Sequence, residues 1–252
     1  MSKNPILHIR GLGVKFGENT VLDDIQFDLN PNEFLGIMGP SGSGKSTILR
    51  SIIGLTRATR GEIVFDGQDL AKLKESKLSQ VRPHIGFVFQ TGALFDSLSV
   101  AENLRYPLKN HTTLTNEQIS ARITERLTEV GLKESADMLP SELSVGMQKR
   151  VGLIRGTILN QKLTLFDEPT AGLDPINIQL FIDRIQSIKK DRLSSAIVVT
   201  HDFSVARCVC DRLALLWQGR LKVIATPKEL QDSNDPIVKS FVMPPYQEAN
   251  CG

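Results

Sequence analysis

The chain has 252 residues, of which 40% are hydrophobic and 23% charged, and its formal net charge at pH 7 is +2. These values are typical of a globular protein, exclude a disordered or fibrous chain, and lack the lysine and arginine excess that favours nucleic acid as the main partner. No run reaches the roughly 18 apolar residues that span a bilayer, and Met1 to Pro5 lack the apolar core of a signal peptide, so we expect a cytosolic chain that does not cross a membrane.

The first segments predict an antiparallel hairpin. Residues 6–16 and 21–29 alternate apolar and polar side chains on either side of a turn that contains Gly17. Phe16 stands just before this turn. It could stack on a nucleotide base or simply pack in the core, and the sequence alone leaves both options open.

The stretch after the next predicted strand, residues 34–38, matches the phosphate-binding pattern G-x-x-x-x-G-K-S/T. Its residues are Gly39, Pro40, Ser41, Gly42, Ser43, Gly44, Lys45, Ser46 and Thr47. The glycines let backbone N–H groups curl around phosphate oxygens at the start of a helix that Gly54 can end. Lys45 can reach the β- and γ-phosphates, Ser46 can place its hydroxyl on Mg²⁺, and Thr47 can bind a phosphate nearer the sugar. The alternative is a Gly- and Ser-rich turn without a ligand.

Polar residues stand at the ends of three further apolar strands. The strand segments are residues 85–90, 163–168 and 196–200. Gln90 could offer its carbonyl to Mg²⁺ or to an attacking water, or be an ordinary strand-ending residue. Asp167 could hold the metal or its water shell, and Glu168 could take the proton from, or orient, a water attacking the γ-phosphate; a solvated turn is the alternative. His201 follows the third strand, where a lone histidine is more often structural, but ligands collect at this edge of open α/β sheets.

A more polar, helical block interrupts the strands at about residues 98–160. One of its helices carries an apolar face formed by Ile119, Ile123, Leu127 and Val130. Ser144 is placed to cap the last helix of the block, which runs to about Leu159. We expect an inserted helical subdomain whose surface contacts a partner, although core packing alone would explain the apolar face.

Taken in order, the motifs resemble those of the nucleotide-binding subunits of ATP-binding-cassette (ABC) transporters, over nearly the entire chain. They are Gly39 to Thr47, Gln90, Leu143 to Met147, Leu163 to Glu168, Ala171 to Asp174 and His201. The resemblance implies the ABC ATPase fold: an α/β P-loop NTPase core with a parallel sheet, an N-terminal antiparallel β-subdomain and the helical insert. We expect one such domain over residues 1–242 and a C-terminal extension over residues 243–252.

The resemblance also implies an ATPase that uses ATP and Mg²⁺. Phe16 would stack on adenine, Gln90 would couple the site to a membrane subunit, and His201 would contact the γ-phosphate. The expected catalytic residues are Lys45, Gln90, Glu168 and His201. The expected metal-binding residues are Ser46, Gln90 and Asp167.

By the same resemblance, two copies form a head-to-tail dimer that sandwiches two ATP molecules. Each ATP would be held by the phosphate loop of one copy and by Ser144 and Gly146 of the other, with Asp174 at the junction. The family usually has two glycines after the signature serine, whereas the first is Val145 here. If that backbone needs a positive φ, the valine is strained by on the order of 1–3 kcal/mol. If it is the first turn of a right-handed helix, valine is tolerated and the Gly146 amide stays available, and we favour this second alternative.

Within the family, the chain is similar to the ATPases of the Mla phospholipid transport systems. The matching stretches are Phe89 to Phe95, Tyr106 to Leu108, His111-Thr112, Pro140 to Ser144, and Asp235-Pro236 with Val238 and Phe241. This likeness implies ATP-driven phospholipid transport between the inner and outer membranes of a Gram-negative envelope. The chain would lie on the cytoplasmic face of the inner membrane, bound to a permease. A periplasmic lipid-binding subunit and a small cytosolic regulatory subunit are the other partners implied.

Two other functions fit the same ATP motifs. One is the ATPase of an importer for a small polar solute such as an amino acid, in which only the permease would differ. The other is a non-transport ABC ATPase that acts on DNA or ribosomes. The near-neutral charge and the single cassette argue against this last function.

Overall fold

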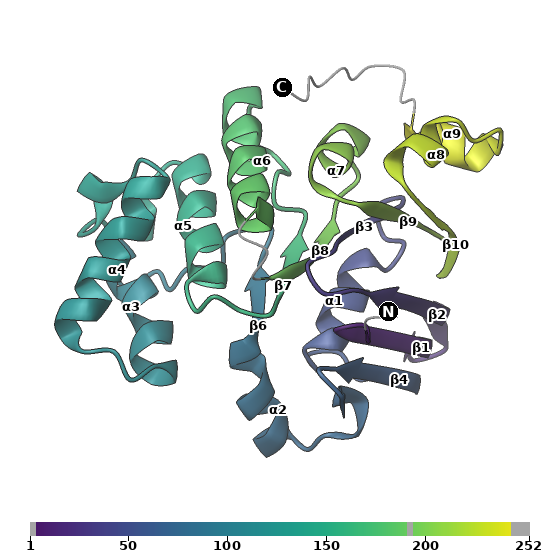
Figure 1. Ribbon diagram of the computed structural model, residues 1–252, viewed down its shortest axis with the longest axis horizontal. Coiled ribbons are helices and arrows are strands. Elements are labelled where there is room, and N and C mark those ends of the chain that lie inside the picture. Colours follow the sequence, from purple (N-terminus) through teal and green to yellow (C-terminus); the bar gives the residue numbers. More distant parts are fainter. Residues whose placement is uncertain (1–3, 191–193, 243–252) are drawn as a thin grey trace.

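The computed structural model describes residues 4–190 and 194–242, which form two sheets with helices around them (Figure 1). The strands are β1 Leu7–Phe16, β2 Asn19–Leu29, β3 Phe34–Met38, β4 Arg60–Phe65, β5 Gln68–Asp69, β6 Ile85–Val88, β7 Leu163–Asp167, β8 Ser195–Val199, β9 Arg212–Trp217 and β10 Arg220–Ala225. The helices are α1 Lys45–Ile52, α2 Glu75–Val81, α3 Val100–His111, α4 Asn116–Glu129, α5 Val145–Thr157, α6 Pro175–Lys190, α7 Phe203–Val209, α8 Pro227–Gln231 and α9 Pro236–Val242. The predicted α/β class is therefore confirmed.

The smaller sheet is antiparallel and has the strand order β2-β1-β4-β5. The predicted hairpin is present, because β1 pairs with β2 from Leu7 opposite Leu29 to Phe16 opposite Asn19. On its other edge β1 pairs with β4, where Leu7 lies opposite Phe65. The N-terminal β-subdomain thus also includes two strands, β4 and β5, that follow the phosphate loop in the sequence.

The larger sheet has the order β10-β9-β3-β8-β7-β6. Strands β3 and β6 to β9 run parallel, as predicted, whereas β10 at the edge is antiparallel to β9. The reversal has a local cause: Gln218 and Gly219, between the two strands, both have positive φ values, of 49° and 75°, which suits a two-residue hairpin turn. In the parallel part, the carboxyl ends of four adjacent strands, β3, β8, β7 and β6, share one edge.

The two faces of the larger sheet bury alternate residues of each strand, as the period of two requires. On β3, Leu35 and Ile37 face a core shared with α1 and the antiparallel sheet. Phe34 and Met38 face the opposite core, which contains the buried side chains of α6 and α7. Helix α1 therefore lies between the sheets, and α6 and α7 cover the other face (Figure 1).

Helices α3, α4 and α5 form a separate group, away from the antiparallel sheet (Figure 1). The group has its own apolar cluster, which includes Ile119, Ile123 and Leu127 of α4 as predicted. Helix α4 ends where expected, with Gly131 at a φ of 68°. The division into one domain and an extension stays a prediction, because residues 243–252 lie outside the described residues. In the described part of the chain, no helix has both the length and the apolar character needed to cross a bilayer.

Candidate functional site

A cleft of about 390 Å³ lies at the carboxyl edge of the parallel strands. Ten of the residues proposed from the sequence line it. They are Phe16, Ser41, Gly42, Gly44, Lys45, Ser46, Thr47, Gln90, Glu168 and His201. Because β3, β8, β7 and β6 are neighbours in the sheet, the segments that follow them meet at this edge even though the sequence separates them widely.

The phosphate loop is shaped by its glycines and opens a helix with free donors. A side chain at Gly39 would place its Cβ 2.4 Å from the carbonyl oxygen of Leu216, so only glycine fits there. Gly44, the N-cap of α1, has a φ of 101° and provides no capping side chain. The first N–H groups of α1 therefore remain available to an anion. Ser43 Oγ is buried without a hydrogen-bond partner, and a phosphate oxygen would satisfy it.

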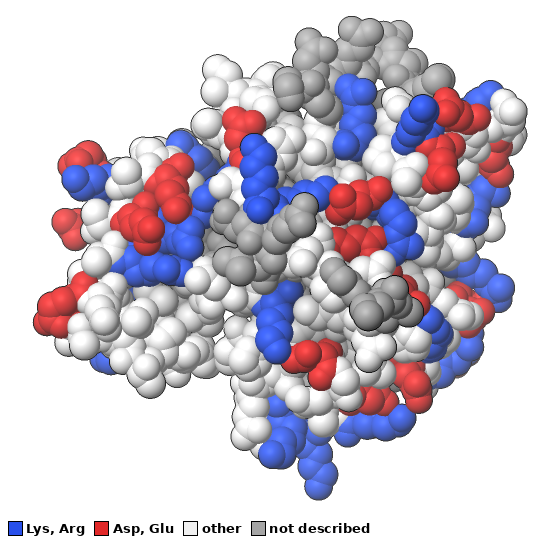
Figure 2. Space-filling model, in the orientation of Figure 1, with Lys and Arg blue, Asp and Glu red and all other residues white. Residues whose placement is uncertain are grey.

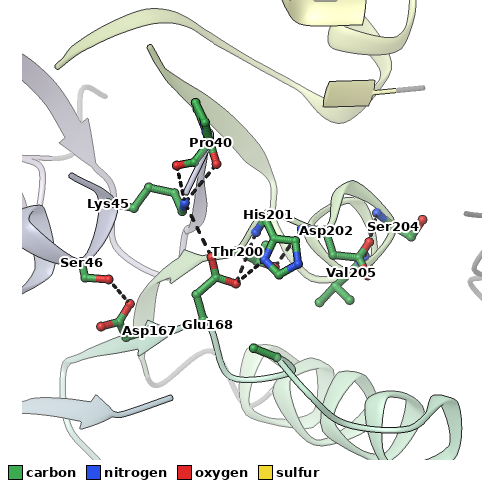
Figure 3. A network of polar contacts seen from close by, with 12 residues as sticks. Pro40, Lys45, Ser46, Asp167, Glu168, Thr200, His201, Asp202, Ser204 and Val205 are labelled. Atoms are coloured by element: carbon green, nitrogen blue, oxygen red, sulfur yellow. Dashed lines mark hydrogen bonds and ion pairs between the residues drawn. The ribbon is translucent and has the colours of Figure 1, made fainter. Parts of the chain in front are cut away.

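Lys45 lies on the floor of the loop, with only 7% of its side chain exposed. Its Nζ donates hydrogen bonds to the carbonyl oxygens of Gly39 at 2.9 Å and Pro40 at 3.0 Å. The same Nζ lies 3.7 Å from Glu168 Oε1 (Figure 3). These contacts hold the ammonium group between the phosphate loop and Glu168, the acid that follows β7.

Ser46 and Asp167 bring two oxygen ligands together. Ser46 Oγ donates a hydrogen bond of 2.6 Å to Asp167 Oδ1, and Asp167 is 4% exposed at the end of β7 (Figure 3). Mg²⁺ in nucleotide sites usually takes one or two protein oxygen ligands and completes its shell with phosphates and water. This hydroxyl and carboxylate fit such an ion. Gln90 lies exposed two residues beyond the end of β6 and lines the same cleft.

Glu168 is held by two neighbouring strands. Its backbone N–H donates to the carbonyl oxygen of Val199 at 2.9 Å. Its Oε2 lies 2.9 Å from His201 Nδ1 and accepts the His201 backbone N–H at 3.4 Å (Figure 3). The Glu168 side chain is 13% exposed, whereas that of His201 is 62% exposed. A carboxylate fixed in this way at the cleft can accept a proton from a water molecule.

Phe16 does not pack in the core. The residue is 56% exposed at the end of β1 and lines the cleft next to the phosphate loop. The core-packing alternative is therefore wrong. Its ring is available to a flat ligand such as a nucleotide base.

Ser144, Gly146 and Asp174 are not among the residues that line this cleft. Ser144 caps α5 as predicted, since its Oγ accepts the Met147 N–H at 3.3 Å. Asp174 accepts two hydrogen bonds from Asn177, of 3.0 and 2.5 Å, and these hold the pKa of its carboxyl below the ordinary value. A Cβ on Gly146 would lie 3.1 Å from Asn177, so these residues are close together. One chain thus presents two separate groups of the proposed binding residues.

The backbone at the signature valine is helical. Helix α5 begins at Val145, which is not among the residues with positive φ. Of the two alternatives for this position, the strained one is wrong and the helical one is confirmed. The Val145 side chain is 61% exposed.

Sequence reasoning missed Lys149, which lies on α5 and is 6% exposed. Its Nζ donates a hydrogen bond to the carbonyl oxygen of Ala171. Burial lowers the pKa of its ammonium group below the ordinary value, and the charge of Glu168 partly offsets that effect. The spacing of Lys149, Gly152 and Gly156 on one helix face is the signal that could have indicated a tightly packed position.

Comparison with known proteins gives consistent matches. The family model described as ABC transporter matches residues 22–171. The chain is 35% identical over 236 residues to the probable ribonucleotide transport ATP-binding protein mkl of Mycobacterium leprae, covering 94% of this chain and 68% of the relative. It is 34% identical over 242 residues to the intermembrane phospholipid transport system ATP-binding protein MlaF of Haemophilus influenzae, covering 96% and 91%. The dimeric post-hydrolysis structure of the ATP-binding cassette MJ0796 with ADP and Pi matches with a TM-score of 0.82 and 31% identity, covering 88% of this chain and 98% of that one.

Proposed function

The chain belongs to the ABC transporter family and is an ATPase that couples ATP hydrolysis to transport; on this premise we propose that it powers phospholipid movement between the inner and outer membranes of a Gram-negative envelope. The meeting of Lys45, Asp167 and Glu168 at one sheet edge carries the ATPase part of this proposal. The cargo is inferred from the likeness to MlaF, which extends over 91% of that relative. The likeness to mkl extends over 68% of that relative.

We infer that the phosphates of ATP bind at the N-terminus of α1. The free N–H groups there and the unpartnered Ser43 hydroxyl would donate hydrogen bonds to phosphate oxygens, and the dipole of α1 favours negative charge. Lys45 would exchange its contact with Glu168 for one with the β- and γ-phosphates. Phe16, exposed at the rim of the cleft, would stack on the adenine ring.

Hydrolysis is assigned to Glu168, the acid that follows β7. Ser46 and Asp167, with Gln90 at the cleft edge, would hold Mg²⁺, which when bound neutralises charge on the β- and γ-phosphates. Glu168 would accept the proton of the water that attacks the γ-phosphate. His201 would keep the Glu168 carboxylate in place through its 2.9 Å contact and reach the γ-phosphate from the same side.

A second copy of the chain would complete the site. Ser144, Gly146 and Asp174 lie outside the cleft of their own chain but close to each other, as expected if they face the ATP held by another copy. The MJ0796 relative is described as dimeric with ADP and Pi bound. Closure of two copies over ATP would exclude water from the phosphates, and loss of the γ-phosphate would release them.

The proposed partners follow from the phospholipid transport function. A membrane permease would hold the chain on the cytoplasmic face of the inner membrane, and Gln90, which stands in an exposed turn, would pass changes in the cleft to it. A periplasmic lipid-binding subunit and a small cytosolic subunit on the helical group would complete the complex. Acidic and basic side chains are interspersed over the face in Figure 2, which shows no broad basic surface that would suit nucleic acid.

Two measurements test the proposal. The first isolates the native complex from membranes and identifies its subunits and bound lipids by mass spectrometry. Phospholipid and a permease are expected. A complex that carries ribonucleotide, the cargo in the name of mkl, or an amino acid would refute the phospholipid assignment while leaving the ATPase intact.

The second measurement tests the catalytic assignment with Glu168→Gln. The amide is nearly isosteric but cannot act as a base, so turnover should fall by about 10² to 10⁴ while ATP still binds. The ATP-bound variant should also form dimers in the presence of Mg²⁺. Unchanged turnover would remove Glu168 from the role of base, and a variant that stays monomeric with ATP and Mg²⁺, alone and with its membrane partners, would refute the sandwich dimer.

A further inference from the structure

Lys149 is a buried cation that the proposed mechanism does not use. Lysine is almost never this buried unless it is paired, yet Lys149 is 6% exposed and its Nζ donates to the main-chain carbonyl of Ala171. Ala171 itself lines the nucleotide cleft. The contact therefore joins α5 to the wall of the site.

The backbone around Ala171 connects the two proposed halves of the site. Glu168 ends the strand side of this segment and Asp174 caps α6 at its other end. The Ala171 N–H donates to the Glu168 carbonyl oxygen at 3.2 Å, and the Leu173 N–H donates to that of Thr170 at 3.2 Å. The Ala171 N–H is bonded to the carbonyl oxygen of Glu168. A displacement of the Ala171 carbonyl group would therefore be passed directly to the backbone of Glu168.

Helix α5 holds Lys149 in a fixed position relative to the sheet. A Cβ at Gly152 would lie 2.6 Å from the Cα of Gly92, and one at Gly156 would lie 2.8 Å from the carbonyl oxygen of Phe87. Both approaches are to backbone atoms, so the helix rests directly on β6 and on the turn that contains Gln90. Lys149, Gly152 and Gly156 are spaced to share one face. The ammonium group is thus held relative to the sheet, and the segment after Glu168 is held relative to the ammonium group.

The hydrogen bond to Ala171 distinguishes Lys149 from a residue that only fills space. An apolar side chain of equal length could fill the same volume but could not donate to a carbonyl, and the Ala171 oxygen would lose a charge-assisted bond. Glu168 also faces Lys45 and His201. Lys149 differs from both because it holds the main chain next to the acid and leaves the carboxylate itself free.

We propose that Lys149 is a positioning residue for ATP hydrolysis, whose hydrogen bond to the Ala171 carbonyl fixes the segment from Glu168 to Asp174. The inference rests on the roles proposed above for these two acids. It links α5, the helix that the signature serine caps, to the acid of the same chain. Lys149 makes no contact with the reacting atoms in this assignment, so its loss should act on turnover and not on nucleotide affinity.

The test compares Lys149→Met with Lys149→Arg, which keeps a charged donor, and with Lys133→Met, which removes an exposed lysine between α4 and α5. The proteins are studied with their membrane partners, and turnover, KM and equilibrium ATP binding are measured. Displacement of a catalytic group by about 1 Å can cost about 10²-fold, so Lys149→Met should lower kcat by about 10- to 100-fold. Its affinity for ATP should stay near that of the wild type. Lys149→Arg should recover most of the loss, and Lys133→Met should match the wild type.

Hydrogen exchange gives a second readout, which is independent of turnover. The amides of residues 170–174 should exchange faster in Lys149→Met, while those of β7 should be unchanged. If Lys149→Met fails to fold, Lys149→Leu, which also lacks a donor, takes its place in the same comparison. Near wild-type turnover, or a loss of ATP binding in step with kcat, would overturn the inference. Normal turnover in Glu168→Gln would instead refute the proposed catalytic base, so the two failures can be told apart.

Discussion

Replacing Val145 with glycine tests how the signature segment works in this chain. The family pattern has glycine at this position, so a simple comparison of sequences predicts that Val145→Gly restores a defective site. The structure predicts otherwise. Val145 is the first residue of α5, has no positive φ, and is 61% exposed. Replacing this valine with glycine would therefore relieve no backbone strain. It would also relieve no crowding, because the valine side chain points largely into solvent.

The size of the effect follows from helix propensity. Valine and glycine differ by about 0.3–0.5 kcal/mol in a helix interior, with glycine the weaker former. At the first turn this difference corresponds to about a twofold change in the population of the ordered segment. A valine held at positive φ would instead be strained by about 1–3 kcal/mol. Relief of that strain would raise turnover by about 5- to 150-fold, because 1.4 kcal/mol is about tenfold.

The assay is steady-state ATP hydrolysis by the assembled transporter at saturating ATP and Mg²⁺, with thermal unfolding measured on the same samples. We expect Val145→Gly to change kcat by less than about tenfold in either direction. The matched control is Gly146→Val, which puts a side chain on the residue whose amide is proposed to bind phosphate, where a Cβ would lie 3.1 Å from Asn177. The Gly146→Val variant should have a kcat more than tenfold below that of the wild type. A gain above tenfold in Val145→Gly would refute the helical interpretation of the signature.

Two further predictions concern binding and stability. Lys45→Ala should weaken ATP binding by about 10- to 100-fold, since a hydrogen bond to a charged group contributes about 1.5–3 kcal/mol; isothermal titration of the purified protein checks this, and unchanged affinity would contradict the assigned role. The hydrogen bond from Arg10 lowers the pKa of the Asp28 carboxyl, so the pair stabilises the fold above the ordinary pKa of aspartate and loses this effect as the pH falls through the lowered value. Asp28→Asn should therefore destabilise the protein by no more than about 1 kcal/mol at neutral pH, because the pair is partly exposed. In strong acid the substitution should have no effect on the free energy of unfolding, as measured with urea. An equal destabilisation at both pH values would contradict this pH dependence.

The phosphate loop and the strand ends were predictable because their information is local. The glycines from Gly39 to Gly44 specify backbone shapes that other residues cannot adopt, and the apolar runs before Asp167 and His201 mark buried strands. One general rule, that parallel strands present their carboxyl ends at a single edge, then brings these segments together without knowledge of the strand order. The order itself, which places β8 between β3 and β7, does not follow from any local pattern.

Other features depend on packing that the sequence does not display. Helix α2 was not predicted because it is one short stretch, Glu75–Val81, with only Leu78 and Val81 buried. The exposure of Phe16 depends on where the hairpin lies relative to the phosphate loop. The contact of Lys149 with Ala171 joins residues 22 positions apart through the seating of α5 on β6, so neither residue alone indicates it.

The backbone conformation of Glu168 orients the carboxylate that we assign as the base. Its φ is 47°, a conformation that costs a residue with a side chain about 1–2 kcal/mol relative to the right-handed form. This conformation alone does not mark a functional residue, because Gln218 in the turn between β9 and β10 has a φ of 49°. At Glu168 the turn points the carboxylate at Lys45 and His201, and the backbone N–H bonded to Val199 and the carbonyl bonded to Ala171 resist relaxation. Glu168 lines the cleft, whereas the Asp167 carboxylate accepts the Ser46 hydroxyl at the proposed metal site, so we assign Glu168, and not its neighbour Asp167, as the base.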